Sequence, residues 1–149
     1  MSSVEFFTMV KEHLNENGVM VVNMNMRGNN EGNINQYLSD TIASVFDHIV
    51  TVDVDGSTNR ELYASSNADM VKTLENNANE TGHSDLRDMM LHVADTSSVY
   101  EAGDYIMTDD KAPVELLGMQ VIDQLIQGEV AYYKDIFEKD GINGLLESL

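Results

Sequence analysis

The sequence contains no cysteine, so neither a disulfide framework nor thiolate chemistry is available to it. Basic residues are also scarce: 8 Lys and Arg stand against 26 Asp and Glu, for a formal net charge of −18. Because phosphate binding needs clustered Lys and Arg, this balance argues against nucleic acid and against anionic lipid surfaces as partners. A cationic amine ligand would be attracted, although a solvated acidic surface is the simpler explanation of the charge.

Long hydrophobic runs are missing as well. The apolar run Val19–Val22 is far too short to cross a bilayer, and residues 1–10 carry Glu5 and lack the apolar core of a signal peptide. We therefore expect a cytoplasmic protein with no membrane contact by this segment. No metal is expected either, since the four histidines lack ligand spacing and residues 53–59 depart from the register of a calcium loop.

The sequence does contain an alternation of helical and extended patterns. Apolar side chains recur at helical spacing over residues 4–15 and 33–45, and the apolar run between them, residues 19–25, indicates a central strand covered by helices on both faces. The segments 48–55 and 60–66 are typical of two antiparallel strands joined by a turn. From Ala68 onward the pattern is mainly helical, with an irregular segment at 95–107 and two helical stretches that meet at Gly128.

This order of elements predicts an α/β fold. Residues 1–67 are expected to form a helix-strand-helix-hairpin unit, and residues 68–149 a mainly helical carboxyl-terminal extension that packs on it, within a single domain overall.

Four motifs add to this pattern: "EFFTMVKEHLNENGVMVVN", Val45-Phe46, Ser66-Asn67, and "TDDKAPVE" from Thr108 to Glu115. Together they resemble the spermidine synthase-like, or polyamine aminopropyltransferase, family, whose members share the class I S-adenosylmethionine methyltransferase fold. "TDDKAPVE" is the most specific of the four. The resemblance implies the carboxyl-terminal half of a Rossmann-like, methyltransferase-type sheet. It would have about three strands ending in an antiparallel hairpin, and additional carboxyl-terminal helices.

In that fold the first half carries the glycine-rich loop and the acidic residue that bind the cofactor. The present sequence has no Gly-x-Gly-x-x-Gly, and Gly28 to Gly32 follow the wrong strand. The resemblance thus implies a spermidine synthase-like fragment with no catalytic residue of its own. Intact relatives transfer an aminopropyl group from decarboxylated S-adenosylmethionine to an amine. This chain alone is expected to hold no cofactor and to be inactive. The alternatives are a non-enzymatic oligomerisation or interaction module, or the remnant of an S-adenosylmethionine-dependent methyltransferase.

One group of candidate substrate-binding residues follows the apolar strand. Ligands of open α/β sheets bind in the crevice at the carboxyl ends of the strands, and in the aminopropyltransferases the loop at this position lines the amine pocket. Asparagines in such a loop can equally serve turn chemistry. The candidates are Asn23, Asn25, Arg27, Asn29 and Asn30.

The other candidates are the carboxylates of "TDDKAPVE", namely Asp109, Asp110 and Glu115. A protonated amine needs carboxylate partners, and its attack on an electrophile needs a base. The alternative is structural: Asp110 caps the helix that follows and Asp109 supports the positive end of that helix.

The apolar strand would also lack its parallel neighbour. Because an open strand edge is a template for pairing, we expect a homodimer formed through this edge. A separately encoded amino-terminal half is the other expected partner.

Overall fold

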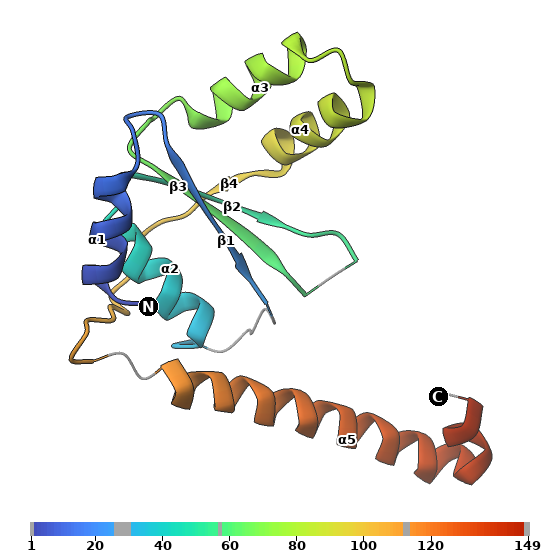
Figure 1. Cartoon of the computed structure of the whole chain (residues 1–149). Helices are drawn as coiled ribbons and strands as arrows, with labels where there is room; N and C mark the ends of the chain where they lie inside the picture. Colours follow the sequence, from blue (N-terminus) through green and yellow to red (C-terminus); the bar gives the residue numbers. More distant parts are fainter. Residues whose placement is uncertain (1, 26–30, 57, 112–113, 148–149) are drawn as a thin grey trace. The chain divides into compact units, whose positions relative to one another are not determined.

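The computed structural model of the chain describes residues 2–25, 31–56, 58–111 and 114–147 (Figure 1). Within these ranges it is an α/β structure with a four-stranded antiparallel sheet and five helices. The chain divides into two compact units, Met1–Ala112 and Pro113–Leu149. The boundary at residues 67 and 68 that the sequence suggested lies inside the first of these units, and it stays a prediction.

The sheet consists of β1 (Val19–Met24), β2 (His48–Asp53), β3 (Arg60–Ser65) and the two-residue β4 (Ser98–Val99), in the order β1-β3-β2-β4. All neighbouring strands are antiparallel, so β1 and β2, on either side of β3, run in the same direction. The predicted hairpin is confirmed, with His48 opposite Ser65 and Asp53 opposite Arg60. The fourth strand, β4, forms inside the segment for which no regular structure was expected.

β1 lies at one edge of this sheet, where β3 is its only neighbour among the described strands. The expectation of an open edge is met, but the prediction of a strand buried on both faces was wrong. Met24 is 2% exposed, whereas Val19 and Val21 are 41% and 52% exposed. Successive side chains of a strand point to opposite faces, and a continuous apolar run does not reveal whether its second face is covered.

The covered face of the sheet packs against α1 (Val4–His13) and α2 (Ile34–Ala43). Phe7 from α1 and Ile42 from α2 meet Leu62 of β3 in the main hydrophobic core, and Ile42 and Leu62 are fully buried. Each such side chain contributes roughly 1.5–3 kcal/mol by leaving water. This core fixes the two helices on the sheet and thereby places the amino terminus of α2 near the carboxyl end of β1.

The opposite face carries α3 (Met70–Glu80) and α4 (Ser84–Thr96), which pack against each other (Figure 1). Val19, Val21 and Tyr63 point to this side, because their neighbours in the strands, Met20, Val22, Leu62 and Ala64, belong to the core with α1 and α2.

The second unit contains α5 (Val114–Glu147), a helix of 34 residues. The sequence suggested two helical stretches, but the helix continues through Gly128, where an added Cβ would meet nothing within 4 Å. Its exposed surface carries the pairs Lys134–Glu138 and Lys139–Asp135, each at i,i+4 spacing. Such pairs contribute only about 0.3–0.5 kcal/mol each, so they support the helix without fixing it.

Candidate functional site

The polar segment after β1 begins at its carboxyl end. Asn23 is exposed and lies on the same face of the strand as Val21. The backbone carbonyl of Asn25 accepts a hydrogen bond from Asn35 Nδ2 of α2 at 3.3 Å, so the strand end is tied to the helix. The predicted candidates Arg27, Asn29 and Asn30 lie outside the described residues.

The structure describes the chain again from Glu31 and Gly32 onward. Gly32 has φ of 70°, in the left-handed region that side chains rarely adopt, and its N–H donates to Gln36 Oε1 at 2.7 Å. Asn33 then caps α2, because its side-chain oxygen accepts from the N–H of Gln36 at 3.0 Å. These local bonds fix the direction in which Glu31 approaches the helix.

A tyrosine from a distant part of the chain joins this turn. The Tyr105 ring lies 4.9 Å from the Tyr37 ring, centroid to centroid, and its hydroxyl donates to Glu31 Oε1 at 3.1 Å. The same ring covers Gly32, whose Cβ would be 3.3 Å from it if one were present. The hydrogen bond to the Glu31 carboxylate raises the pKa of Tyr105 above its ordinary value, so the phenol stays protonated and keeps donating.

Asp40 holds Tyr105 in this position. Its side chain is fully buried, and its carboxylate accepts from the Tyr100 hydroxyl at 2.6 Å and from the backbone N–H groups of Gly103 and Tyr105 at 3.0 and 3.1 Å. Such an ion survives burial only when its lone pairs are satisfied. One carboxylate of α2 therefore organises the whole turn from Tyr100 to Tyr105.

Thr41, the next residue of α2, extends this attachment. It is also fully buried, and its Oγ1 donates to the carbonyl of Tyr37 at 2.6 Å and accepts from the N–H of Met107 at 2.9 Å.

Burial is the main cause that raises the pKa of the Tyr100 phenol far above its ordinary value, and the hydrogen bond to Asp40 adds to it. Tyr100 is thus a permanent donor at neutral pH.

The "TDDKAPVE" segment lies at a different place in the first unit. Ser3 caps α1, accepting from Phe6 N at 3.3 Å, and its Oγ donates to Asp109 Oδ1. The Asp109 N–H in turn donates to Glu5 Oε2 at 3.0 Å. Asp109 therefore supports the amino terminus of α1, where a carboxylate is favoured by the helix dipole, and its predicted support of the following helix stays untested.

The remaining acidic candidates are less constrained. Asp110 is exposed in the turn closed by the bridge between Thr108 and Lys111. The side chain of Glu115 lies outside the described part, and so do residues 112 and 113 before α5, which leaves the predicted cap at Asp110 untested. Within the described ranges, no hydrogen bond or ion pair joins Asp109 or Asp110 to Asn23 or Asn25.

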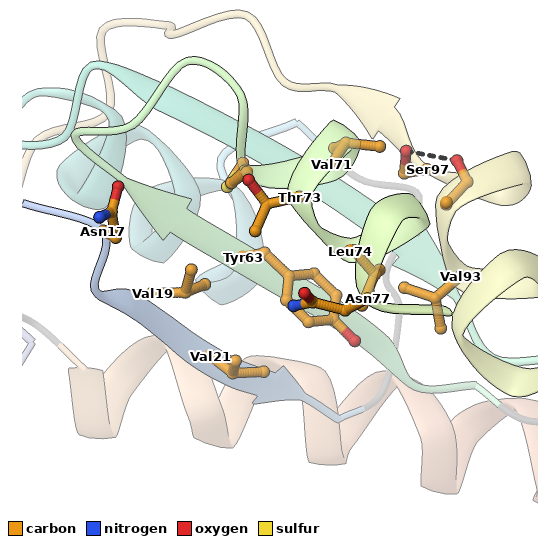
Figure 2. Close-up of a pocket in the computed structure, with 12 residues that line it drawn as sticks. Asn17, Val19, Val21, Tyr63, Val71, Thr73, Leu74, Asn77, Val93 and Ser97 are labelled. Carbon is orange, nitrogen blue, oxygen red and sulfur yellow. Dashed lines mark hydrogen bonds between the residues drawn. The ribbon is translucent and has the colours of Figure 1, made fainter. Parts of the chain in front are cut away.

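A cavity of about 350 Å³ lies on the other face of the sheet, between β1, β3, α3 and α4. Figure 2 shows Val19, Val21 and Tyr63 of the sheet facing Leu74 and Val93 of the two helices. Its size is at the lower end of small-molecule sites, and its lining is mainly apolar, with a few polar side chains such as Asn17, Thr73 and Asn77. It carries no titratable pair that could perform chemistry, and we assign the candidate site to the carboxyl end of β1.

Sequence reasoning missed Glu31, Tyr37, Asp40 and Tyr105. Tyr37 and Asp40 were counted with a helix, and Tyr105 fell in the irregular segment. Only the pairing of residues 60 or more positions apart reveals their common role. The described residues contain no cluster of three metal-ligating side chains, and none of their helices is both long and apolar enough to cross a membrane.

Polar and acidic groups at the carboxyl end of a strand are typical of α/β proteins that bind small ligands. The chain is 47% identical over 166 aligned positions to a protein of Bifidobacterium longum (strain NCC 2705) described as a "Probable polyamine aminopropyl transferase". The alignment covers 100% of this chain and 37% of that relative, so the chain spans little more than a third of the relative's length. No family model and no solved structure matches the chain. The match confirms the resemblance of the chain to spermidine synthase-like proteins.

Proposed function

We propose that this chain supplies the amine-binding side of an aminopropyltransferase that uses decarboxylated S-adenosylmethionine. The match to the curated relative over the entire chain carries the proposal. It is supported by the tyrosines and the carboxylate that meet near the amino terminus of α2, which Asn35 ties to the carboxyl end of β1.

In the proposed reaction, the lone pair of the amine nitrogen forms a bond to the aminopropyl carbon beside the sulfonium sulfur. The carbon–sulfur bond breaks, its electron pair stays on sulfur, and methylthioadenosine leaves. The attacking nitrogen loses a proton to a base. The positive sulfonium already activates the leaving group, so the protein's task is to orient the amine, to remove the proton and to stabilise cationic groups.

The described residues offer acceptors for a cationic amine but no glycine-rich loop for the nucleoside. We therefore propose that the cofactor is held by a part of the protein other than this chain, and that the sheet is the corresponding part of a methyltransferase-type fold. The co-directional β1 and β2, with β3 between them, are compatible with this.

The direct test mixes the purified chain with decarboxylated S-adenosylmethionine and putrescine and measures the release of methylthioadenosine. We expect none from the chain alone, and turnover once it is combined with the remainder of the curated relative. Turnover by the isolated chain would refute the proposal that another part of the protein holds the cofactor. A combined protein that uses S-adenosylmethionine to methylate the amine instead would replace aminopropyl transfer with methyl transfer.

A second role is favoured by one specific observation, the exposed edge of β1. Val19 and Val21 stand on this edge strand beside backbone groups that no described strand pairs with. We propose that a second copy of the chain pairs with this edge and that the protein is a homodimer, because an apolar open edge is a template for strand addition.

Light scattering coupled to size exclusion tests the dimer. Val21→Lys places a charge on the edge strand and should convert the dimer to a monomer, whereas Met89→Lys changes a similarly exposed residue of α4 (58% against 52%) and should not. A wild-type chain that stays monomeric at micromolar concentration would contradict the homodimer. If the edge pairs only with a separate amino-terminal half, a heterodimer replaces the proposed homodimer.

A further inference from the structure

We propose that Glu31, Tyr37 and Tyr105 form a binding site for one primary ammonium group of the substrate. The proposal rests on the proposed function, since it names the residues that hold the amine in that reaction. None of the three belongs to the candidates that sequence reasoning identified, and they meet only because the turn 100–105 folds back onto α2.

The hydrogen-bond directions leave acceptors at this place. The Tyr105 hydroxyl donates its hydrogen bond to Glu31 Oε1, with 3.1 Å between the two oxygens. Its oxygen lone pairs therefore remain available, and Glu31 Oε2 has no partner among the residues that the structure describes. An ionised carboxylate and a phenol oxygen side by side accept hydrogen bonds, which suits an ammonium group that has three donors and no acceptor.

The two rings favour the same occupant. The Tyr37 and Tyr105 rings lie 4.9 Å apart, centroid to centroid, with their planes tilted by 59°, and the Glu31 carboxylate lies at the hydroxyl end of Tyr105. A cation near an aromatic face is attracted electrostatically, and a neutral alcohol of the same length is not. The chain's net charge of −18 raises the local concentration of cations in general, so the site must be distinguished from the whole acidic surface.

The cluster is also held in place before any ligand binds. Tyr105 is fixed through its backbone N–H by the buried Asp40, Tyr37 through its carbonyl by Thr41, and Glu31 precedes the Gly32 turn that Gln36 closes. A site whose groups are already ordered loses less conformational entropy on binding. This organisation separates the three residues from an ordinary exposed glutamate.

The test is a titration of the whole chain with putrescine, followed by NMR of the tyrosine rings and the backbone amides, without decarboxylated S-adenosylmethionine. We expect saturable shifts of the Tyr37 and Tyr105 ring signals. Glu31→Gln should weaken binding by about tenfold, the effect expected for losing one charge-assisted hydrogen bond. Tyr105→Phe, which keeps the ring and removes the hydroxyl, should weaken binding less, and it serves as the second variant if Glu31→Gln disturbs the fold.

Two controls separate the site from the acidic surface. Glu80→Gln removes the same charge from the exposed end of α3 and should leave putrescine binding unchanged. The neutral isostere 1,4-butanediol should produce no saturable shift. The proposal is overturned if putrescine shifts are spread over the surface, if Glu31→Gln and Glu80→Gln behave alike, or if 1,4-butanediol binds equally well.

The outcome is independent of catalysis, so the two proposals can fail separately. If putrescine binds at Glu31 but the combined protein releases no methylthioadenosine, the binding-site proposal stands and the proposal of aminopropyl transfer is refuted. Conversely, if the combined protein turns over and Glu31→Gln does not change its KM for putrescine, the proposed reaction stands and the proposed binding site is refuted.

Discussion

Asp40→Asn is the substitution that most directly tests how the turn 100–105 is held. The change keeps the shape of the side chain and removes its charge. It also replaces one carboxylate oxygen by an NH2 group. Asp40 Oδ2 accepts from Tyr105 N and Oδ1 accepts from Tyr100 and Gly103, so an amide in any orientation turns at least one acceptor into a donor that faces another donor.

The magnitude follows from the three bonds. A hydrogen bond to a charged group contributes about 1.5–3 kcal/mol, and a neutral one about 0.5–1.5 kcal/mol. One bond is lost and two are weakened by roughly 1 kcal/mol each, while relief from burying an ion returns part of the loss. We expect a net destabilisation of about 2–3 kcal/mol and a fall in Tm of roughly 6–10 °C.

Thermal and urea unfolding, followed by circular dichroism, measure this loss. Asp88→Asn is the matched control, because it removes the same charge from an exposed position of α4 and should change stability by less than about 0.5 kcal/mol. Equal stability of Asp40→Asn and the wild type would refute the assignment of Asp40 as the anchor of this turn. A destabilised variant whose Tyr105 ring signal is unmoved would refute its link to the site.

Three further outcomes follow from the same structure. Gly103→Ala should destabilise by about 1–3 kcal/mol, since its Cβ would lie 2.6 Å from Asp40 Oδ2, while Gly82→Ala, with nothing within 4 Å, should be neutral or slightly stabilising in the same unfolding assay. Tyr100→Phe should flatten the loss of stability above pH 10. The folded state raises the Tyr100 pKa from 10.0, so the wild type loses stability as pH rises beyond the unfolded value, and urea titrations from pH 8 to 11 detect the difference. Leu62→Ala, at a fully buried position, should cost about 2–5 kcal/mol, and Leu86→Ala, at a position 42% exposed, much less; equal losses would contradict the core as described.

Local patterns were sufficient to predict most of the elements. The helix behind Ser3, the strand at Val19 and the hairpin around Gly56 all depend on spacing and turn chemistry within about ten residues, and each is present. The open edge of the first strand was also expected. Its exposed second face was not, because a run of four apolar residues looks the same whether one or both of its faces are covered.

The candidate site was much harder to predict. Asn23 and Asn25 were proposed because a strand end is a local feature, and their role stays a prediction. Tyr105 and Asp40 are 65 residues apart in sequence, yet the Tyr105 N–H lies 3.1 Å from Asp40 Oδ2. Asp109 was interpreted as a support for the helix that follows it. In the structure it contacts Ser3, more than a hundred residues earlier. Long-range hydrogen bonds of this kind leave no periodic signal in a single sequence.

These long-range hydrogen bonds also explain how the candidate site at Tyr105 is ordered although one face of β1 is exposed. Tyr100 of the turn 100–105 packs against the core, and hydrogen bonds of residues 100–107 to Asp40 and Thr41 add to this attachment. Because both anchors lie on α2, which the core with Phe7 and Leu62 fixes to the sheet, Tyr105 keeps a defined position relative to the carboxyl end of β1 without help from the exposed edge. Pairing at that edge and binding of an amine can therefore vary independently. A dimer-breaking substitution such as Val21→Lys should leave putrescine binding at Glu31 intact.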